Sequence, residues 1–130
     1  MKIFFDGGCR PNPGPMETAV VAGGVADHRP SVGHGTSLEA EWLALFHALD
    51  VAHQRGVRDV ILLGDAAQLV ALASGRAKAR SERDRDRVER FREAARGFDR
   101  VRLRHVKRTQ NLAGIALAGR DRCPSPRGTQ

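Results

Sequence analysis

A long stretch of helical periodicity, set between short apolar runs, is the feature that most constrains the fold of this chain. Between residues 37 and 55 apolar side chains recur at helical spacing, which predicts one long amphipathic helix that Gly56 ends. Segments typical of strands lie before and after it, at residues 2–5, 18–25, 31–35, 57–63 and 100–106. This order predicts an α/β fold with one mixed five-stranded sheet, in which three antiparallel opening strands are followed by parallel additions, flanked by helices.

Turn-forming residues and weaker periodic segments complete the prediction. The Asp-Gly-Gly sequence at residues 6–8 and the segment 27–30 are expected to form turns. The loop of residues 9–15 contains three prolines and a glycine, which exclude a helix or a central strand. Shorter helices are predicted at residues 66–73, 81–96 and 109–118. We therefore expect one domain over residues 1–118 and a mobile C-terminal tail over residues 119–130.

The composition fits a single small domain. The chain has 130 residues, of which 41% are hydrophobic, so one core of moderate size is expected. Only 5% of the residues are aromatic and none is tyrosine, so aliphatic side chains must fill that core. The same shortage argues against the aromatic platforms on which proteins stack single-stranded bases.

Positive charge is concentrated in one segment. The formal net charge is +7, yet residues 76–108 contain 14 Lys and Arg against 6 Asp and Glu, a net of +8, so the rest of the chain sums to −1. A local basic region indicates a surface for a polyanionic partner such as a nucleic acid. The alternative is an arginine-rich helix that is only solvated.

Cysteine usage and hydropathy bear on the compartment. Cys9 and Cys123 fit no metal-binding spacing and indicate no disulfide framework. The sequence opens into a strand rather than into the apolar run of a signal peptide, and no segment approaches transmembrane length. We expect a cytoplasmic, monomeric protein without a membrane partner.

Three acidic residues lie where predicted strands end or a helix begins. Asp6 and Asp65 each follow a strand, and Glu41 lies in the first turns of the long helix. Because chemistry in open α/β sheets gathers at the carboxyl ends of strands, these side chains can meet at one corner. Clustered carboxylates remain ionised together only beside a cation, and hard oxygen ligands favour Mg²⁺ or Mn²⁺. Two such ions would support phosphoryl transfer.

Each acid also has a simpler interpretation. Asp6 can serve a turn, Glu41 can interact with the helix dipole, and Asp65 can cap the helix that follows it. The presence of all three on one chain with a basic region favours a metal-dependent enzyme that acts on nucleic acid.

Four segments form the pattern of a known family. They are residues 6–15 (Asp-Gly-Gly-Cys-Arg-Pro-Asn-Pro-Gly-Pro), residues 40–45 with Ala48-Leu49, Gly64-Asp65 with residues 68–70, and residues 105–108 with Asn111, Ala113 and Ala118. In this order, over residues 1–118, they resemble the motifs of type 1 ribonuclease H, and the first segment is the most specific of them. The resemblance implies a ribonuclease H-like fold and an endonuclease that cleaves the RNA strand of RNA–DNA hybrids, leaving 5′-phosphate and 3′-hydroxyl ends.

The resemblance also implies roles for the acids. Asp6, Glu41 and Asp65 match the first three metal-binding acids of the family, so Asp6 would bridge two ions, Glu41 would hold one and Asp65 the other.

The loop after the first strand is expected to meet the substrate. Cys9 and Asn12 match loop positions that contact the hybrid, with Arg10 between them, and an amide there can recognise a 2′-hydroxyl. Asn12 can also form an Asx turn before Pro13, and the two roles are compatible.

The last helix departs from the family pattern. A fourth acid usually stands four residues after the Asn of the C-terminal motif, where this chain has Ile115, which cannot bind a metal. Asn111 lies one turn earlier on the same helical face, and we expect its amide oxygen to support the second ion, directly or through water. The alternative is that Asn111 caps the helix or bonds to a neighbouring loop.

Two further departures concern substrate binding. The polar pair before the helix glutamate is Ser37-Leu38, of which only Ser37 can form side-chain hydrogen bonds, and Glu39 is expected to serve the helix dipole. No insertion resembles the basic protrusion of some members, so the arginines of residues 76–96 are expected to follow the DNA backbone. In some members a mobile His near the site helps metal exchange or product release, and Arg108 is the residue best placed for that role here.

Two other functions remain open. Loss of the fourth acid is compatible with a hybrid- or duplex-binding module that no longer catalyses, and the same fold can also carry a structure-specific DNA nuclease. Retention of the three acids favours the ribonuclease.

Overall fold

The computed structural model describes residues 1–122, with side chains up to residue 119. Its strands are β1 (Lys2–Cys9), β2 (Gly14–Ala22), β3 (Val25–Arg29), β4 (His34–Gly35), β5 (Asp59–Gly64) and β6 (Arg100–His105). Its helices are α1 (Ser37–Gln54), α2 (Ala67–Ala73), α3 (Glu82–Ala95), the short 3-10 helix η1 (Arg108–Gln110) and α4 (Leu112–Arg122). The long first helix and the alternation of helices and strands after it agree with the sequence prediction.

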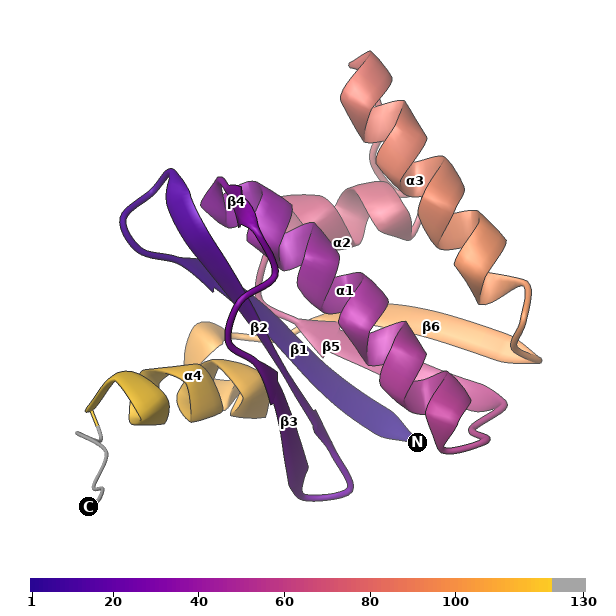
Figure 1. The fold of residues 1–130 in the computed structure, drawn as a ribbon. Coiled ribbons are helices and arrows are strands. Elements are labelled where there is room, and N and C mark those ends of the chain that lie inside the picture. The colour runs from indigo at the N-terminus through magenta and orange to yellow at the C-terminus, as the bar shows by residue number, and fades with distance from the viewer. Residues whose placement is uncertain (123–130) are drawn as a thin grey trace.

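The strands form one mixed sheet with β1 at its centre. The order is β3-β2-β1-β5-β6, and the two-residue β4 pairs with β2 outside this path (Figure 1). β1 is antiparallel to β2, and β2 to β3, whereas β1–β5 and β5–β6 are parallel. The predicted mixed sheet, with antiparallel opening strands and parallel additions, is therefore confirmed, but it has six strands rather than the expected five, because the short β4 adds to β2.

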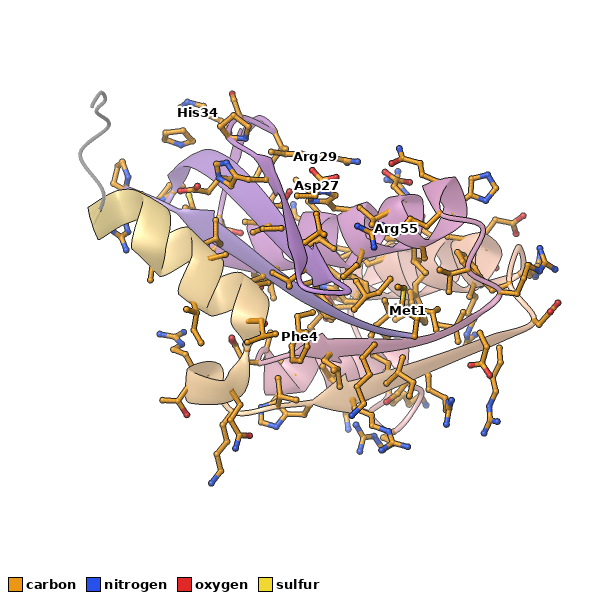
Figure 2. The ribbon with its side chains drawn as sticks, turned by 90° about the horizontal axis from the view of Figure 1, so that it is seen from below. Met1, Phe4, Asp27, Arg29, His34 and Arg55 are labelled. Carbon is orange, nitrogen blue, oxygen red and sulfur yellow. The ribbon has the colours of Figure 1, made fainter. Side chains whose placement is uncertain are left out.

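Helices cover both faces of the sheet. Ile3 and Phe5 of β1 point into the main core, which α1, α2 and α3 complete. Phe4, between them, points to the opposite face, on the side of α4 (Figure 2). It packs there against a cluster formed by Ala19 and Val21 of β2 with Ala113 and Leu117 of α4. This alternation gives the central strand two buried faces, as expected for a strand that pairs on both edges.

β1 is longer than predicted and passes through Asp6. The expected turn at residues 6–8 is wrong, because the strand continues to Cys9 and Asp6 pairs with Ala19 of β2. Gly7 is required by packing instead, since a Cβ at this position would clash with the carbonyl oxygen of Ala40 in α1. Gly7, one of two glycines that favour a turn in the sequence, thus allows α1 to approach β1 closely.

The turn between the second and third strands is at Gly23-Gly24, not at residues 27–30 as expected. Both glycines have positive φ, 57° and 76°, which suits a tight hairpin. The predicted turn is therefore part of β3, and of the predicted strand at residues 31–35 only β4 forms. β2 begins at Gly14, inside the loop predicted for residues 9–15.

α1 begins with a capping box. The hydroxyl of Thr36 accepts a hydrogen bond from the N–H of Glu39 (3.1 Å), and the Glu39 carboxylate accepts one from the N–H of Thr36 (3.3 Å). Glu39 is thus engaged at the start of the helix, and the next acid, Glu41, lies on the face of α1 that meets β1.

α3 joins the fold through a narrow apolar stripe. Val88 and Phe91 are buried among charged neighbours, and the guanidinium of Arg87 lies over the ring of Trp42 in α1, 5.9 Å from its centroid. Ser81, the predicted first residue of this helix, is its N-cap.

The last helix extends further than predicted. α4 continues to Arg122, so its predicted end at residue 118 is wrong and the first residues of the predicted tail are helical. The rest of that tail, residues 123–130, lies outside the described residues. Within residues 1–122, no helix has both the length and the apolar character that crossing a membrane requires.

We predict that Gly7→Ala destabilises the fold by about 3 kcal/mol or more, because the new methyl group meets the backbone of α1, which cannot move without disturbing the core. Urea unfolding monitored by circular dichroism measures the change. Gly8→Ala is the matched control, since a Cβ there would meet its nearest atoms at an ordinary 3.9 Å. Equal stability of the two variants would contradict this account of Gly7.

Candidate metal centre

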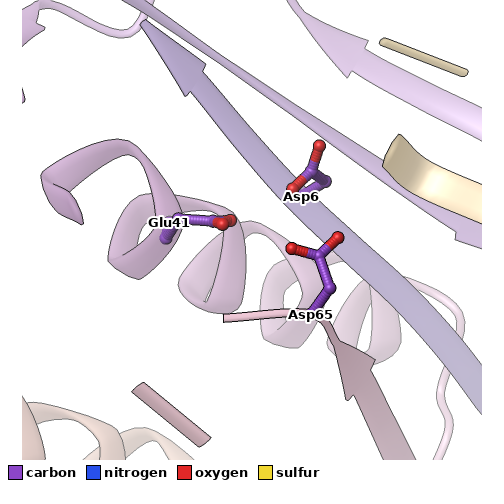
Figure 3. A group of neighbouring side chains, drawn as sticks. All are labelled: Asp6, Glu41 and Asp65. Atoms are coloured by element: carbon purple, nitrogen blue, oxygen red, sulfur yellow. The ribbon is translucent and has the colours of Figure 1, made fainter. Parts of the chain in front are cut away.

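Three carboxylates from three elements converge at one end of β1. Asp6 projects from the strand, Glu41 from the second turn of α1, and Asp65 follows the last residue of β5 (Figure 3). One oxygen from each carboxylate lies within 4.8 Å of the others. The expectation that these acids meet at one corner of the sheet is confirmed.

The backbone of β1 holds Glu41 in place. The N–H of Gly7 donates a hydrogen bond to Oε1 of Glu41 (2.9 Å), at the point where the absence of a side chain brings strand and helix together. Asp65 reaches the same corner because β5 pairs parallel with β1, with Leu63 opposite Phe4. The local fold therefore sets all three positions.

Burial and mutual repulsion make ionisation of this cluster unfavourable. Burial, followed by the charge of Asp65, raises the pKa of Asp6 to about 6, although Arg108 acts in the opposite direction. Burial, followed by the charge of Asp6, raises the pKa of Glu41 to about 8. A divalent cation would relieve this repulsion, and carboxylate oxygens are the ligands that Mg²⁺ and Mn²⁺ prefer. The residues present thus fit such an ion.

Asn111 is fully buried and has three protein partners. Its Nδ2 donates to the carbonyl oxygen of Phe5 (3.0 Å) and to Oδ2 of Asp65 (2.9 Å). Its Oδ1 accepts from the N–H of Ala113 (3.1 Å), so the side chain caps α4. The amide oxygen that we expected to face the second ion is occupied in this way, and the geometry favours the alternative role, a cap that also orients Asp65.

An open cleft of about 450 Å³ lies over the carboxylates. Four of the predicted substrate-binding residues line it: Cys9, Arg10, Ser37 and Arg108. Asn12 does not line the cleft; its Oδ1 accepts a hydrogen bond from the N–H of Ser37 (3.1 Å) and so joins the β1–β2 loop to the start of α1.

Comparisons with known proteins agree with this arrangement. Residues 17–120 match the family described as "Reverse transcriptase-like". Ribonuclease HI of Halobacterium salinarum is 34% identical over 123 residues, which cover 91% of this chain. The chain belongs to the type 1 ribonuclease H family. It spans 62% of the length of that H. salinarum protein.

Solved structures of type 1 ribonucleases H share the fold. RNase H1 from H. salinarum NRC-1 superposes with a TM-score of 0.80 at 30% identity, covering 94% of this chain and 98% of that one. The N-terminal RNase H domain of rv2228c from Mycobacterium tuberculosis, solved as a fusion with maltose-binding protein, gives 0.75 at 26% identity, covering 94% and 97%. LC11-RNase H1, solved in complex with an RNA/DNA hybrid, gives 0.77 at 22% identity, covering 89% and 91%. The ribonuclease H-like fold expected from the sequence is confirmed.

The departure at residue 115 is visible in the cleft. Ile115 lines it and is 53% exposed, whereas family members usually carry an acid at this position. Its neighbour Gly114 lies against the carboxylates, since a Cβ there would be 3.3 Å from Oδ2 of Asp6 and 3.7 Å from Oδ2 of Asp65. α4 therefore covers the site closely without contributing a carboxylate from residue 115.

Sequence reasoning missed the residues that act through their backbone or their register. Gly7 and Gly114 were not recognised as neighbours of the acids, because a turn or a helix interior explains a glycine equally well in a sequence. Glu17 of β2 also lines the cleft and was not singled out. Its position follows only from the pairing of β2 with β1.

In the metal-free protein, Asp6→Asn is expected to raise stability at neutral pH. In the unfolded chain the carboxyls of Asp6 and Glu41 have ordinary pKa values of 3.8 and 4.5, whereas in the folded protein their pKa values are about 6 and about 8. The folded state thus binds more protons in this window, so the free energy of unfolding falls as the pH rises from about 4 to about 8. Removing the Asp6 charge should recover on the order of 2–3 kcal/mol at the upper end.

Thermal unfolding in EDTA and in Mg²⁺, at about pH 5 and about pH 8, measures this effect. Mg²⁺ should stabilise the wild-type protein at the higher pH and should have much less effect on Asp6→Asn, because a ligand that binds only the folded state raises its stability. An unchanged or lower melting temperature of Asp6→Asn in EDTA would contradict the electrostatic account.

Asn111→Asp separates the two roles of Asn111. If Asn111 caps α4 and donates to Asp65, a carboxylate at this position is unfavourable. It leaves the Phe5 carbonyl without its donor and places a second acid against Asp65. We expect a loss of about 2–5 kcal/mol in stability and no gain in Mn²⁺ affinity. Urea unfolding and Mn²⁺ titration give the two values.

Asn12→Asp is the control, because an acceptor at the start of α1 remains and stability should hardly change. A stable Asn111→Asp variant with tighter Mn²⁺ binding would instead make residue 111 a direct ligand.

Proposed function

We propose that this chain hydrolyses the RNA strand of RNA–DNA hybrids with two Mg²⁺ or Mn²⁺ ions, leaving 5′-phosphate and 3′-hydroxyl ends. The observation that carries the proposal is the convergence of Asp6, Glu41 and Asp65 within 4.8 Å at an open cleft of a ribonuclease H fold. Its relatives are a ribonuclease HI and RNase H1 proteins, of which LC11-RNase H1 was solved with a hybrid. We take the protein to act as a cytoplasmic monomer.

The three acids divide the work of holding the ions. Asp6, Glu41 and Asp65 would hold the ions together, with Asp6 shared between them; the N–H of Gly7 fixes Glu41, and the amide of Asn111 fixes Asp65. The bound ions would supply the Lewis acidity that activates water and offsets the phosphate charge. The protein contributes preorganised ligands, since two of the three carboxylates already have backbone or amide donors that set their orientation.

The walls of the cleft provide contacts for the substrate. Arg108 is close enough to lower the pKa of Asp6, so it can also attract a phosphate of the RNA strand. Cys9, Arg10 and Ser37 also line the cleft. They come from the end of β1, the β1–β2 loop and the start of α1. Asn12 accepts from Ser37 through Oδ1, and its Nδ2 is the group that we propose to donate to a 2′-hydroxyl.

The basic segment is divided between two places in the fold. Residues 76–96 lie on the α2–α3 loop and on α3, whereas Arg100, Arg102 and Arg104 lie on β6 (Figure 1). On α3 itself several arginines pair with acids of the same helix, including Arg90 with Asp86 and Arg96 with Glu93. The α2–α3 loop contains Arg and Lys but no acid. We propose that residues 76–96 follow the DNA strand, with affinity that falls steeply with salt.

One observation favours a second candidate, a hybrid-binding module without catalysis. The position of the usual fourth acid is the apolar Ile115, which cannot hold an ion. Against this candidate stands the cluster of three acids, because a binding protein has no use for carboxylates such as Asp6 and Glu41, whose pKa values are raised by burial and by their own clustering.

A cleavage assay tests the proposed function. The wild-type protein should cut the labelled RNA strand of a hybrid with Mg²⁺ or Mn²⁺, and the products should carry 5′-phosphates. Asp6→Asn should lower the rate by about 100-fold or more, because one of the three acids that would hold the ions is lost. Asp50→Asn, which changes an exposed acid of α1 that pairs with Arg29, is the matched control and should retain the wild-type rate.

Three outcomes would redirect the proposal. Full activity of Asp6→Asn would show that the three acids are not the site. Absence of cleavage with either metal, together with undiminished hybrid binding, would leave the binding module. Equal cutting of double-stranded DNA and hybrid would indicate a DNA nuclease.

A further inference from the structure

Glu17 is a fourth acid of the cleft, and it comes from a strand rather than from the last helix. It lines the same cavity as Asp6 and Glu41, and Ile115 lines that cavity too. The cleft therefore has an isoleucine where the resemblance implies an acid, and it has a carboxylate, Glu17, that the resemblance does not imply.

The register of the sheet places Glu17 next to Asp6. Asp6 pairs with Ala19, and Gly8 pairs with Glu17, so Asp6 and Glu17 are diagonal neighbours in an antiparallel pair. Val20 of β2 points into the main core, so Ala19 and Glu17 point to the opposite face of the sheet. Ala19 clusters there with residues of α4, so Asp6 and Glu17 lie on the face that α4 covers. Diagonal neighbours lie about 7–8 Å apart, which a long side chain can span.

Gly8 is the residue that pairs directly with Glu17. A Cβ at Gly8 would be an ordinary 3.9 Å both from Cγ of Glu17 and from Cδ1 of Leu117 in α4. The Cγ of Glu17 and the side chain of Leu117 thus both lie beside Gly8, on the face of the sheet that α4 covers.

His28 fixes one oxygen of Glu17. Nε2 of His28 on β3 lies 2.7 Å from Oε1 of Glu17, and the two side chains are only 13% and 28% exposed. A partly buried hydrogen bond of this kind restricts the orientation of the carboxylate, and Glu17 still lines the cleft. Partners that orient ligands in this way are a regular part of metal sites.

We propose that Glu17 replaces the acid missing at residue 115 and acts as the fourth carboxylate of the metal centre, with His28 as its positioning residue. Glu17 would help to hold an ion through a bound water, because its carboxylate lines the cleft but is not among the three whose oxygens lie within 4.8 Å of one another. The inference rests on the proposed function, since it assumes that Asp6, Glu41 and Asp65 hold divalent ions. With Glu17 in this role, the metal centre has four carboxylates although residue 115 is apolar.

Direct Mn²⁺ binding tests the inference independently of catalysis. Electron paramagnetic resonance of free Mn²⁺, in titrations of the full chain, should show that Glu17→Gln weakens binding by about 10-fold or more. The amide preserves the shape of the side chain and its acceptor for His28, so the fold is retained, and a thermal melt confirms this. Glu39→Gln is the matched control, because Gln also completes a capping box, and its Mn²⁺ affinity should equal that of the wild type.

Three further variants examine the replacement itself. Ile115→Asp should restore Mn²⁺ affinity to Glu17→Gln, since it supplies a carboxylate from α4. His28→Leu should weaken Mn²⁺ binding and His28→Gln should recover it, because Gln can still donate to Glu17. Unchanged affinity in Glu17→Gln, or an equal gain from Ile115→Asp with and without Glu17, would overturn the inference and leave Glu17 as a partner of His28 alone.

The result is distinguishable from failure of the proposed function. If Asp6→Asn abolishes Mn²⁺ binding and hybrid cleavage while Glu17→Gln changes neither, the metal centre stands and the role of Glu17 falls. If Asp6→Asn changes neither, the proposed function itself is wrong.

Discussion

The close approach of β1 to α1 at Gly7 is the constraint on which the rest of the structure depends. Without a side chain at this residue the two backbones meet, and the N–H of Gly7 donates to Glu41 across the contact. The helix is thereby seated on the central strand and Glu41 is brought to Asp6 in the same step. Asp65 arrives there because β5 runs parallel to β1. One backbone contact thus determines both how the main core packs and where the carboxylates lie.

This arrangement brings the carboxylates of Asp6, Glu41 and Asp65 together in a partly buried place, where the protein alone makes their ionisation unfavourable. Burial and repulsion raise the pKa values of Asp6 and Glu41, and Arg108 offsets only part of the effect at Asp6. The protein compensates locally, with an amide donor to Asp65 and a backbone donor to Glu41, but these donors orient the carboxylates more than they neutralise them. Binding of the proposed divalent ions would therefore be coupled to folding through the same side chains, so their removal would act on the stability of the whole domain as well as on its chemistry.

Sequence patterns predicted the fold class and the meeting of the three acids, because both follow from the order of elements and from positions at strand and helix ends. They failed where a residue type has two uses. Gly7 and Gly8 indicate a turn in a sequence but continue β1, where Gly7 allows close packing, while Gly23-Gly24 forms the hairpin turn that was expected four residues later. Asn111 was a plausible ligand by its spacing, and only its three partners show a cap. Glu17 could not be found without the register of β2 on β1, which depends on long-range pairing.

Asn111 also has a consequence for the order in which the protein matures. Its side chain joins the carbonyl of Phe5, 106 residues earlier in the chain, to the carboxylate of Asp65 and to the first turn of α4. During synthesis the acids of β1, α1 and β5 therefore emerge well before the residue that ties two of their elements together. A nascent chain that has not yet released α4 can collapse around its core but has an unrestrained Asp65, so nuclease activity should appear only when the final helix docks.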